Sequence, residues 1–251
     1  MVRKRIIPCL DVLGGKTVKG VNFVNLTEIG DPVDMGRFYA EQGADELVYL
    51  DISASYEGRG AFRNLVSRIA KGINIPFTVG GGISSADDAS ALLDAGADKV
   101  SVNTSALENP ALIDKIASKF GSQFIVVAVD AVEKDGFWQV MKKGGRFYAD
   151  RELFEWSEEA CSRGAGEILF TSVGHDGTRA GFACSTLSLL STMLPVPVIA
   201  SGGAGTMSHF ADVFYEGKAD AALAASVFHS GEIPVPELKR WLAGQGISVR
   251  L

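Results

Sequence analysis

The sequence has few of the residues that form disulfides or hold metals. Its 251 residues include three cysteines and three histidines, and neither type occurs in a CxxC or clustered spacing. An odd, unpatterned set of cysteines is typical of proteins that keep free thiols in a reducing compartment. Scattered histidines offer no structural metal site. We therefore expect a cytoplasmic protein with free thiols and with neither a metal nor another cofactor.

Long apolar runs and an excess of positive charge are also missing. No apolar run approaches the roughly 20 residues that a membrane span requires, and no secretory segment is recognisable. The net charge of −6 argues against a general nucleic-acid-binding role, which a basic face would carry. The hydrophobic content of 47% is that of a soluble globular protein. We expect small molecules as ligands, and neither nucleic acids nor membranes.

The main feature that is present is an internal repeat. Four segments of the first half recur in the same order in the second half: 6–11 as 125–130, 43–49 as 164–170, 76–82 as 197–203, and 97–104 as 219–226. The chain therefore consists of two similar halves, 1–122 and 123–251. Because a duplicated half also duplicates its site, the matched aspartates and glycine turns are the first candidates for function.

The repeat predicts a closed barrel. We expect strands at 5–11, 46–51, 76–80, 98–102, 124–130, 167–171, 197–201 and 220–224, and helices at 31–43, 59–72, 85–95, 108–119, 151–163, 185–193, 206–216 and 234–244. Continuous apolar strands separated by helices are typical of a parallel sheet covered on both faces. Eight such units favour one (βα)8 TIM barrel domain spanning 1–251. An open doubly wound sheet would place a GxGxxG turn after its first strand, whereas Gly14-Gly15 leads into a hairpin-like stretch.

Asp11 and Asp130 end the first and fifth expected strands, where a barrel carries its catalytic residues. Two separated carboxyl groups can divide acid and base work. Strand-end aspartates often only cap the following turn, but a pair at equivalent positions of a repeat favours a catalytic role. We expect Asp130 to be protonated and Asp11 ionised at the working pH. Asp51 and Asp176 add carboxylates to the same rim.

Two glycine-rich turns occupy matching positions in the two halves. Residues 79–84 lie beside 102–104 in the first half, and residues 201–205 lie beside 225–226 in the second. Glycine lets backbone N–H groups approach an anion closely. One such turn is weak support, since strand–helix turns often need glycine, but two symmetric turns predict a ligand with a phosphate at each end. Lys19 in the first loop would bring a mobile positive charge over one of them.

Charged residues also lie at the starts of expected strands, at the opposite end of the barrel: Arg5, Glu46, Lys99 and Glu167. They would form either an inward ring of alternating sign or an ordinary solvated face. A buried ionic layer is costly unless every charge is paired. If the ring exists, we expect it to have a task beyond stability.

At these residues the sequence resembles the cyclase subunits of imidazole glycerol phosphate synthase, from histidine biosynthesis. The resemblance covers the chain from Lys4 to nearly its end, and it is carried by residues 4–12, 30–33, 76–83, 96–101, 120–123, 164–169, 199–205 and 221–229. It implies a (βα)8 enzyme that adds ammonia to the bis-phosphorylated ribulosyl-formimino aminoimidazole carboxamide ribonucleotide. The products would be imidazole glycerol phosphate and aminoimidazole carboxamide ribonucleotide.

The resemblance also implies roles for individual residues. The general base would be Asp11 and the general acid Asp130. Phosphate contacts would come from Gly82, Asn103 and Thr104 at one end and from Gly203 and Ser226 at the other, and the substrate would be lined by Lys19, Asp51, Thr171, Asp176 and Ser201. A partner glutaminase would dock on the N-terminal face of the barrel and supply ammonia through a gate of Arg5, Glu46, Lys99 and Glu167.

The chain departs from the family pattern at three places. The loop after the sixth strand has Gly174 where a carboxylate is frequent and Phe182 where a tyrosine is frequent, and Phe147-Tyr148 follows Gly144-Gly145-Arg146 in place of Thr-Gly. We expect these changes to modulate the rate and not to abolish activity, because both aspartates remain.

Two alternative functions stay open on the sequence. The sibling isomerase of the same pathway is also a duplicated half-barrel with two aspartates and two phosphate turns, but it usually opens Ile-Pro-Ala-Ile-Asp-Leu and needs no gate. Pro8-Cys9-Leu10-Asp11 and the four charged residues favour the cyclase. A phosphate-binding barrel that has lost catalysis is the other alternative, and the altered loop motivates it.

Overall fold

The computed structural model describes residues 2–21, 24–52 and 59–251. Its centre is a closed barrel of parallel strands, which confirms the predicted (βα)8 fold. The barrel strands are β1 (Arg5–Leu13), β4 (Leu47–Asp51), β5 (Phe77–Gly80), β6 (Lys99–Val102), β7 (Ile125–Lys134), β10 (Glu167–Ser172), β11 (Val198–Ser201) and β12 (Ala221–Ala224). Pairing between β10 and β7 closes the ring.

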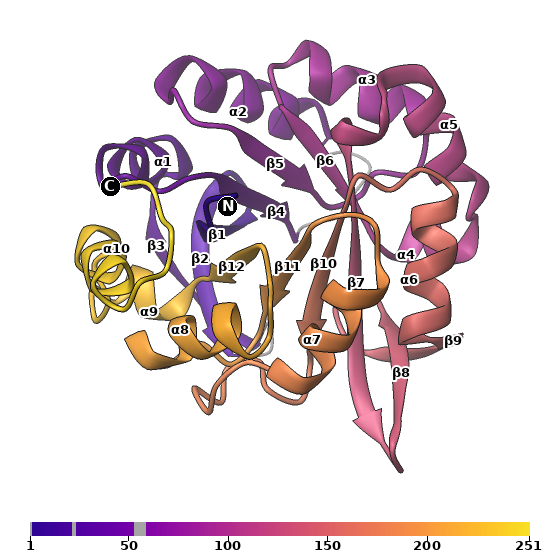
Figure 1. The fold of residues 1–251 in the computed structure, drawn as a ribbon. Helices are drawn as coiled ribbons and strands as arrows, with labels where there is room; N and C mark the ends of the chain where they lie inside the picture. Colours follow the sequence, from indigo (N-terminus) through magenta and orange to yellow (C-terminus); the bar gives the residue numbers. More distant parts are fainter. Residues whose placement is uncertain (1, 22–23, 53–58) are drawn as a thin grey trace.

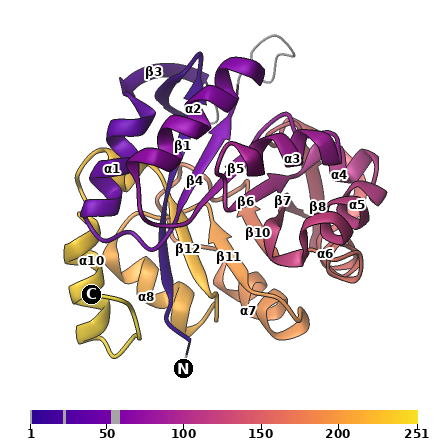
Figure 2. The ribbon, with the colours of Figure 1, turned by 90° about the horizontal axis from the view of Figure 1, so that it is seen from above.

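Helices connect the strands and lie outside them (Figures 1 and 2). They are α1 (Pro32–Glu41), α2 (Arg59–Gly72), α3 (Ala86–Asp94), α5 (Ala111–Phe120), α6 (Leu153–Ser162), α7 (Cys184–Met193), α8 (Met207–Tyr215) and α10 (Val235–Gly244). Local signals set several of their ends: Asp31 caps α1 by accepting from the backbone N–H groups of Val33 and Asp34, and Pro32 occupies the first turn. No helix in these described ranges is long and apolar enough to cross a membrane.

Several elements are additions to the predicted pattern. The hairpin-like stretch after Gly14-Gly15 is a full antiparallel pair, β2 (Lys16–Val21) and β3 (Val24–Gly30). A second antiparallel extension follows Asp130, because β7 continues to Lys134 and pairs with β8 (Phe137–Lys142), which pairs with β9 (Phe147–Glu152). The short helices α4 (Thr104–Glu108) and α9 (Ser226–His229) and the 3-10 turn η2 (Ser122–Phe124) were also not predicted.

The core has two parts, one outside and one inside the barrel. The outer part lies between the strands and the helices and contains most of the large buried side chains. The inner part consists of Ile7, Cys9, Val48, Val126, Leu169, Ile199, Ala221 and Leu223. This small apolar layer lies inside the barrel, between the strand starts and the mouth.

The strands give the barrel two distinct ends. The chain begins on the face turned toward the viewer in Figure 1, beside the start of β1, and β1 rises from the N-terminus in Figure 2. The C-terminal segment returns to this same face, because the Lys4 N–H donates to the Ser248 carbonyl at 2.8 Å. The opposite face holds the strand ends and is the mouth of the barrel.

Candidate active site and charged layer

The two aspartates lie across the mouth from each other. Asp11 is on β1, in register with Leu50 of β4, and Asp130 is on β7, in register with Thr171 of β10. In the ring order, three strands separate β1 from β7 on each side. The pairing therefore places the two carboxyl groups on opposite walls, as the repeat predicted.

Burial raises the pKa of both carboxyl groups. The pKa of Asp11 rises from 3.8 to about 6, first because the group is buried and second because Asp176 brings another negative charge. Burial likewise raises the pKa of Asp130 to about 6, against hydrogen bonds from Asn103 and Thr171 that favour the ionised form. Asn103 Nδ2 donates to Asp130 Oδ2 at 2.9 Å. Because the two values are similar, the expected division into an ionised Asp11 and a protonated Asp130 stays a prediction for the substrate complex.

The raised pKa values predict that these aspartates destabilise the free protein at neutral pH. Each carboxyl has a pKa near 6 in the folded chain and 3.8 in the unfolded chain. Its stabilising effect is therefore fully present below pH 3.8 and is lost as the pH rises through about 6. We expect Asp11→Asn to raise the unfolding free energy by about 1–2 kcal/mol at pH 7.5 and by no more than about 0.5 kcal/mol at pH 4. Thermal unfolding at both pH values checks this, with the exposed Asp94→Asn as the control. An equal shift at both pH values would contradict it.

The first glycine turn follows β5 and lies beside the end of β6. Gly81 has a φ of +101°, and a Cβ there would overlap the Asp51 carbonyl oxygen, so only glycine fits. Thr104 Oγ1 accepts a hydrogen bond from the Lys143 N–H at 2.8 Å, which leaves the hydroxyl hydrogen free to donate. Asn103 and Thr104 therefore present polar groups at the strand end beside this turn, and Asn103 also connects the turn to Asp130.

The second turn follows β11 and is held by the loop after β10. A Cβ at Gly203 would overlap the Gly181 carbonyl oxygen, and the Gly181 N–H donates to the Gly203 carbonyl at 2.8 Å. Ser226 begins α9 next to it. The positive charge of Lys19 acts on His229 and Glu232, which places Lys19 on this side of the mouth. The expected role of Lys19 as a positive charge over a phosphate stays a prediction, with the second turn as the nearer candidate.

The remaining expected lining residues also lie on the rim. Asp51 ends β4, and Thr171 and Ser201 are register partners on β10 and β11. Asp176 lies in the loop between β10 and α7, and its negative charge raises the pKa of both Asp11 and Asp130. Burial raises the pKa of Asp176 itself, and a hydrogen bond from the Gly177 backbone opposes this.

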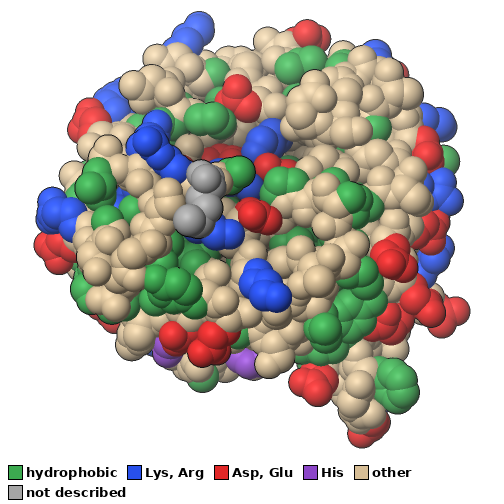
Figure 3. Space-filling view, in the orientation of Figure 1, with side chains coloured by type: hydrophobic (Ala, Val, Ile, Leu, Met, Phe, Trp, Pro, Cys, Tyr) green, Lys and Arg blue, Asp and Glu red, His purple; other side chains and the backbone are tan. Residues whose placement is uncertain are grey.

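The four charged residues at the other end form a closed ring. Arg5 Nη1 donates to Glu46 Oε2 at 2.8 Å and to Glu167 Oε1 at 2.9 Å, and Lys99 Nζ donates to the same two carboxylates at 2.9 and 3.2 Å. Each cation thus touches both anions, and the side chain of Glu46 is only 2% exposed. The solvated-face alternative is wrong. In Figure 3, blue and red side chains gather in a hollow at the centre of this face.

Thr78 also belongs to this layer, although it was not among the charged residues expected there. The Thr78 hydroxyl donates to Glu46 Oε1 at 2.8 Å, and Thr78 is 1% exposed. It is in register with Lys99 on the neighbouring strand. The sequence does contain a signal for it: Thr78 is a polar residue inside a short apolar strand. It shares a face with Gly80, because alternate residues of a strand share a face.

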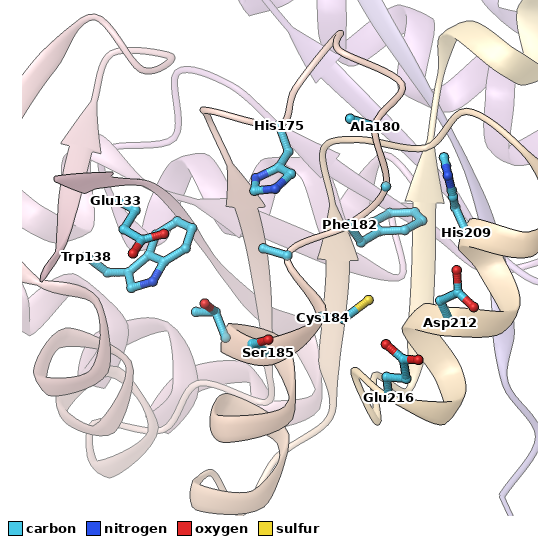
Figure 4. A pocket seen from close by; sticks show the side chains of 13 residues that line it. Glu133, Trp138, His175, Ala180, Phe182, Cys184, Ser185, His209, Asp212 and Glu216 are labelled. Atoms are coloured by element: carbon cyan, nitrogen blue, oxygen red, sulfur yellow. The ribbon is translucent and has the colours of Figure 1, made fainter. Parts of the chain in front are cut away.

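The two departures in the loop after β10 have different surroundings. A Cβ at Gly174 would meet only Val132 Cγ2 at 4.0 Å, so a Cβ fits there without a clash. Phe182 is buried and packs edge-on against Phe210 with centroids 5.6 Å apart. It lines a surface groove with His175, His209 and Cys184 on the outer side of the loop (Figure 4). The expectation that these changes only modulate the rate stays a prediction.

Comparisons with known proteins agree over the full chain. A family model described as histidine biosynthesis protein matches residues 5–234. A protein of Phocaeicola vulgatus named imidazole glycerol phosphate synthase subunit HisF is 62% identical over 251 residues, with 100% of both chains covered. Proteins of the same name from Bacteroides thetaiotaomicron and Flavobacterium johnsoniae are 61% and 57% identical over 250 and 251 residues, again with 100% of both chains covered.

Proposed function

The chain belongs to the histidine biosynthesis family as a HisF-type subunit of imidazole glycerol phosphate synthase, and from this premise we propose how its residues perform the cyclase reaction. The enzyme converts the bis-phosphorylated ribulosyl-formimino aminoimidazole carboxamide ribonucleotide and ammonia into imidazole glycerol phosphate and aminoimidazole carboxamide ribonucleotide. The observation that carries the residue assignments is a pair of buried carboxyls on opposite walls of the mouth, with a glycine turn on each side.

The two aspartates divide the proton transfers. Adding ammonia, cleaving the chain and closing the imidazole ring each require a proton to be taken and another to be given. Asp11 is the general base and Asp130 the general acid. Their pKa values near 6 support this, because groups that titrate near neutrality can exchange protons in both directions. Bound phosphates and closure over the substrate would raise the pKa of Asp130 further and keep its proton in place.

The two turns fix the ends of the substrate. One phosphate binds to Gly82, Asn103 and Thr104, and the other to Gly203 and Ser226 with the charge of Lys19 above it. Asp51, Thr171, Asp176 and Ser201 line the space between. Anchoring both ends holds the reacting atoms between the two carboxyl groups, which replaces a search in solution by a fixed geometry.

Ammonia enters from the opposite end of the barrel. The subunit name implies a multi-subunit synthase, and we infer that the partner is a glutaminase docked on the N-terminal face, in the cytoplasm. The ring of Arg5, Glu46, Lys99 and Glu167 would gate the path from that face to the mouth. The ion pairs of this ring support a gate. Each charge contacts two opposite charges, so it can break one contact while it keeps the other.

The sibling isomerase is the less favoured function. Its reaction needs no ammonia and therefore no gate, whereas this barrel has an ionic layer across its end. The similarity to HisF subunits over the full chain agrees with the cyclase.

An ammonia-dependent assay on the purified chain tests the proposal. We expect loss of substrate absorbance with ammonium salt at alkaline pH, where free ammonia is present, and none with glutamine until a glutaminase subunit is added. Turnover without ammonia would point to the isomerase. Substrate binding without turnover at saturating ammonium would point to a barrel that has lost catalysis.

A further inference from the structure

A half-buried histidine joins three elements next to the second phosphate turn. Tyr39 of α1 shares a hydrogen bond with His229 Nδ1 at 2.7 Å, and His229 Nε2 bonds the Cys9 carbonyl of β1 at 2.9 Å. His229 itself ends α9, the short helix that begins with Ser226. Neither His229 nor Tyr39 has a part in the reaction as proposed above.

The protonation state of this chain of bonds follows from its partners. A carbonyl oxygen can only accept, so His229 Nε2 carries the hydrogen. Burial raises the pKa of the Tyr39 phenol, which therefore keeps its proton and donates to Nδ1. Burial lowers the pKa of His229 to about 4, with Lys19 adding to the effect. The imidazole is thus neutral and has a single tautomer, with both ring nitrogens used.

The link lies where the strand pairing stops. The register between β1 and β12 ends at Pro8 and Ala224, and His229 bonds the carbonyl of Cys9, the next residue of β1. On the other side, the His229 N–H donates to the Ala225 carbonyl at 2.9 Å, within the same turn as Ser226. The imidazole therefore replaces the ladder bond that would connect the phosphate turn to the strand of Asp11.

We propose that His229 is a positioning residue that holds the second phosphate turn at a fixed place relative to Asp11, with Tyr39 orienting its ring. This rests on the proposed function. A substrate anchored at both ends transmits any displacement of one anchor to its reacting atoms, and a misplacement of about 1 Å can cost on the order of 100-fold in rate. The specificity for a ligand of one length would depend on the same link.

Three variants test the proposal. His229→Leu removes both hydrogen bonds, His229→Gln keeps an N–H that can reach the Cys9 carbonyl, and Tyr39→Phe removes only the phenol hydroxyl. The matched control is Tyr49→Phe, which deletes another buried hydroxyl, the donor to the Pro32 carbonyl at 3.2 Å, away from the phosphate turn. Each variant is assayed for kcat and KM with ammonium, for thermal stability, and for inorganic phosphate affinity by titration.

We expect His229→Leu to lower kcat/KM by roughly 10- to 100-fold and to weaken one of two phosphate-binding events, with partial rescue in His229→Gln. Tyr39→Phe should lower kcat/KM about threefold to tenfold. It should also raise the pKa of His229 in an NMR titration, because its Nδ1 lone pair loses its donor. Tyr49→Phe should change stability alone.

Unchanged kcat, KM and phosphate affinity in both His229→Leu and Tyr39→Phe would overturn the proposal and reduce the link to packing. If His229→Leu does not fold, the comparison of kcat, KM and phosphate affinity between Tyr39→Phe and Tyr49→Phe decides whether the link positions the turn. If the wild-type chain shows no cyclase turnover, the proposed function fails on its own. The phosphate titration still tests the link, because it measures the turn without the reaction.

Discussion

Asp11→Asn and Asp130→Asn are each expected to lower ammonium-dependent turnover by roughly 100- to 10,000-fold while leaving substrate affinity within a few-fold of wild type. Each amide keeps the shape of the carboxyl but can neither accept nor give a proton in the reaction. Both glycine turns that we propose to bind the phosphates persist in these variants, so the substrate should still be held. Steady-state kcat and a separate equilibrium binding titration measure the two effects.

The contradicting outcome is a large loss of affinity with unchanged turnover in either variant. The stability of these two variants is the control for misfolding, because removing a carboxyl with a pKa near 6 should make the chain more stable at pH 7.5. In Asp130→Asn, the oxygen of the new amide can still accept the hydrogen bond that Asn103 donates. A variant that is more stable, binds substrate and does not turn over would separate catalysis from folding.

Glu46→Gln is expected to produce the largest loss of stability. Glu46 accepts from Arg5, Lys99 and Thr78 at 2.8 to 3.0 Å and is 2% exposed. The neutral amide leaves Glu167 as the one carboxylate shared by two half-buried cations, Arg5 and Lys99. We expect a loss of about 3 kcal/mol of unfolding free energy, and therefore a melting temperature lower by roughly 6–12 °C for a chain of this length.

The functional part of this prediction concerns ammonia delivery. Turnover with ammonium salt should stay near the wild-type rate, because the mouth is untouched, whereas glutamine-driven turnover with a glutaminase subunit should change. Asp45→Asn is the matched control, since Asp45 forms a buried pair with Lys239 at 2.9 Å outside the layer. It should lower stability without changing the ratio of the two activities. An unchanged ratio in Glu46→Gln would make the layer purely structural.

Much of the architecture was predictable because its signals are local. Short apolar strands and amphipathic helices alternate, and the duplication doubles that signal, so all eight barrel strands lie where they were expected. The positions of Asp11 and Asp130 followed from the same pattern, since strand ends of a parallel barrel form its mouth. The division into two half-barrel units stays a prediction from the repeat.

The antiparallel extension after Asp130 lies beyond the strand that the sequence predicts, although the sequence contains its turn. Asp135 and Gly136 both have positive φ, the geometry of a two-residue hairpin turn, and Asp-Gly is a strong signal for it. The sequence pattern predicts that this strand ends at Asp130, because a barrel strand normally stops at the mouth. The hairpin is favoured instead because β8 packs Trp138 against Phe170, with ring centroids 5.3 Å apart.

The barrel, the order of its units and the residue types at each strand end follow from local patterns, because strand and helix periods and glycine turns act over a few residues. The meeting of charges depends on the fold. The ring of Arg5 and Lys99 with two glutamates exists because closure brings four strands together, and the pKa values near 6 arise from burial that no local pattern encodes. The bonds of His229 to β1 and α1 likewise join residues that are distant in the chain, and only the folded barrel makes them neighbours.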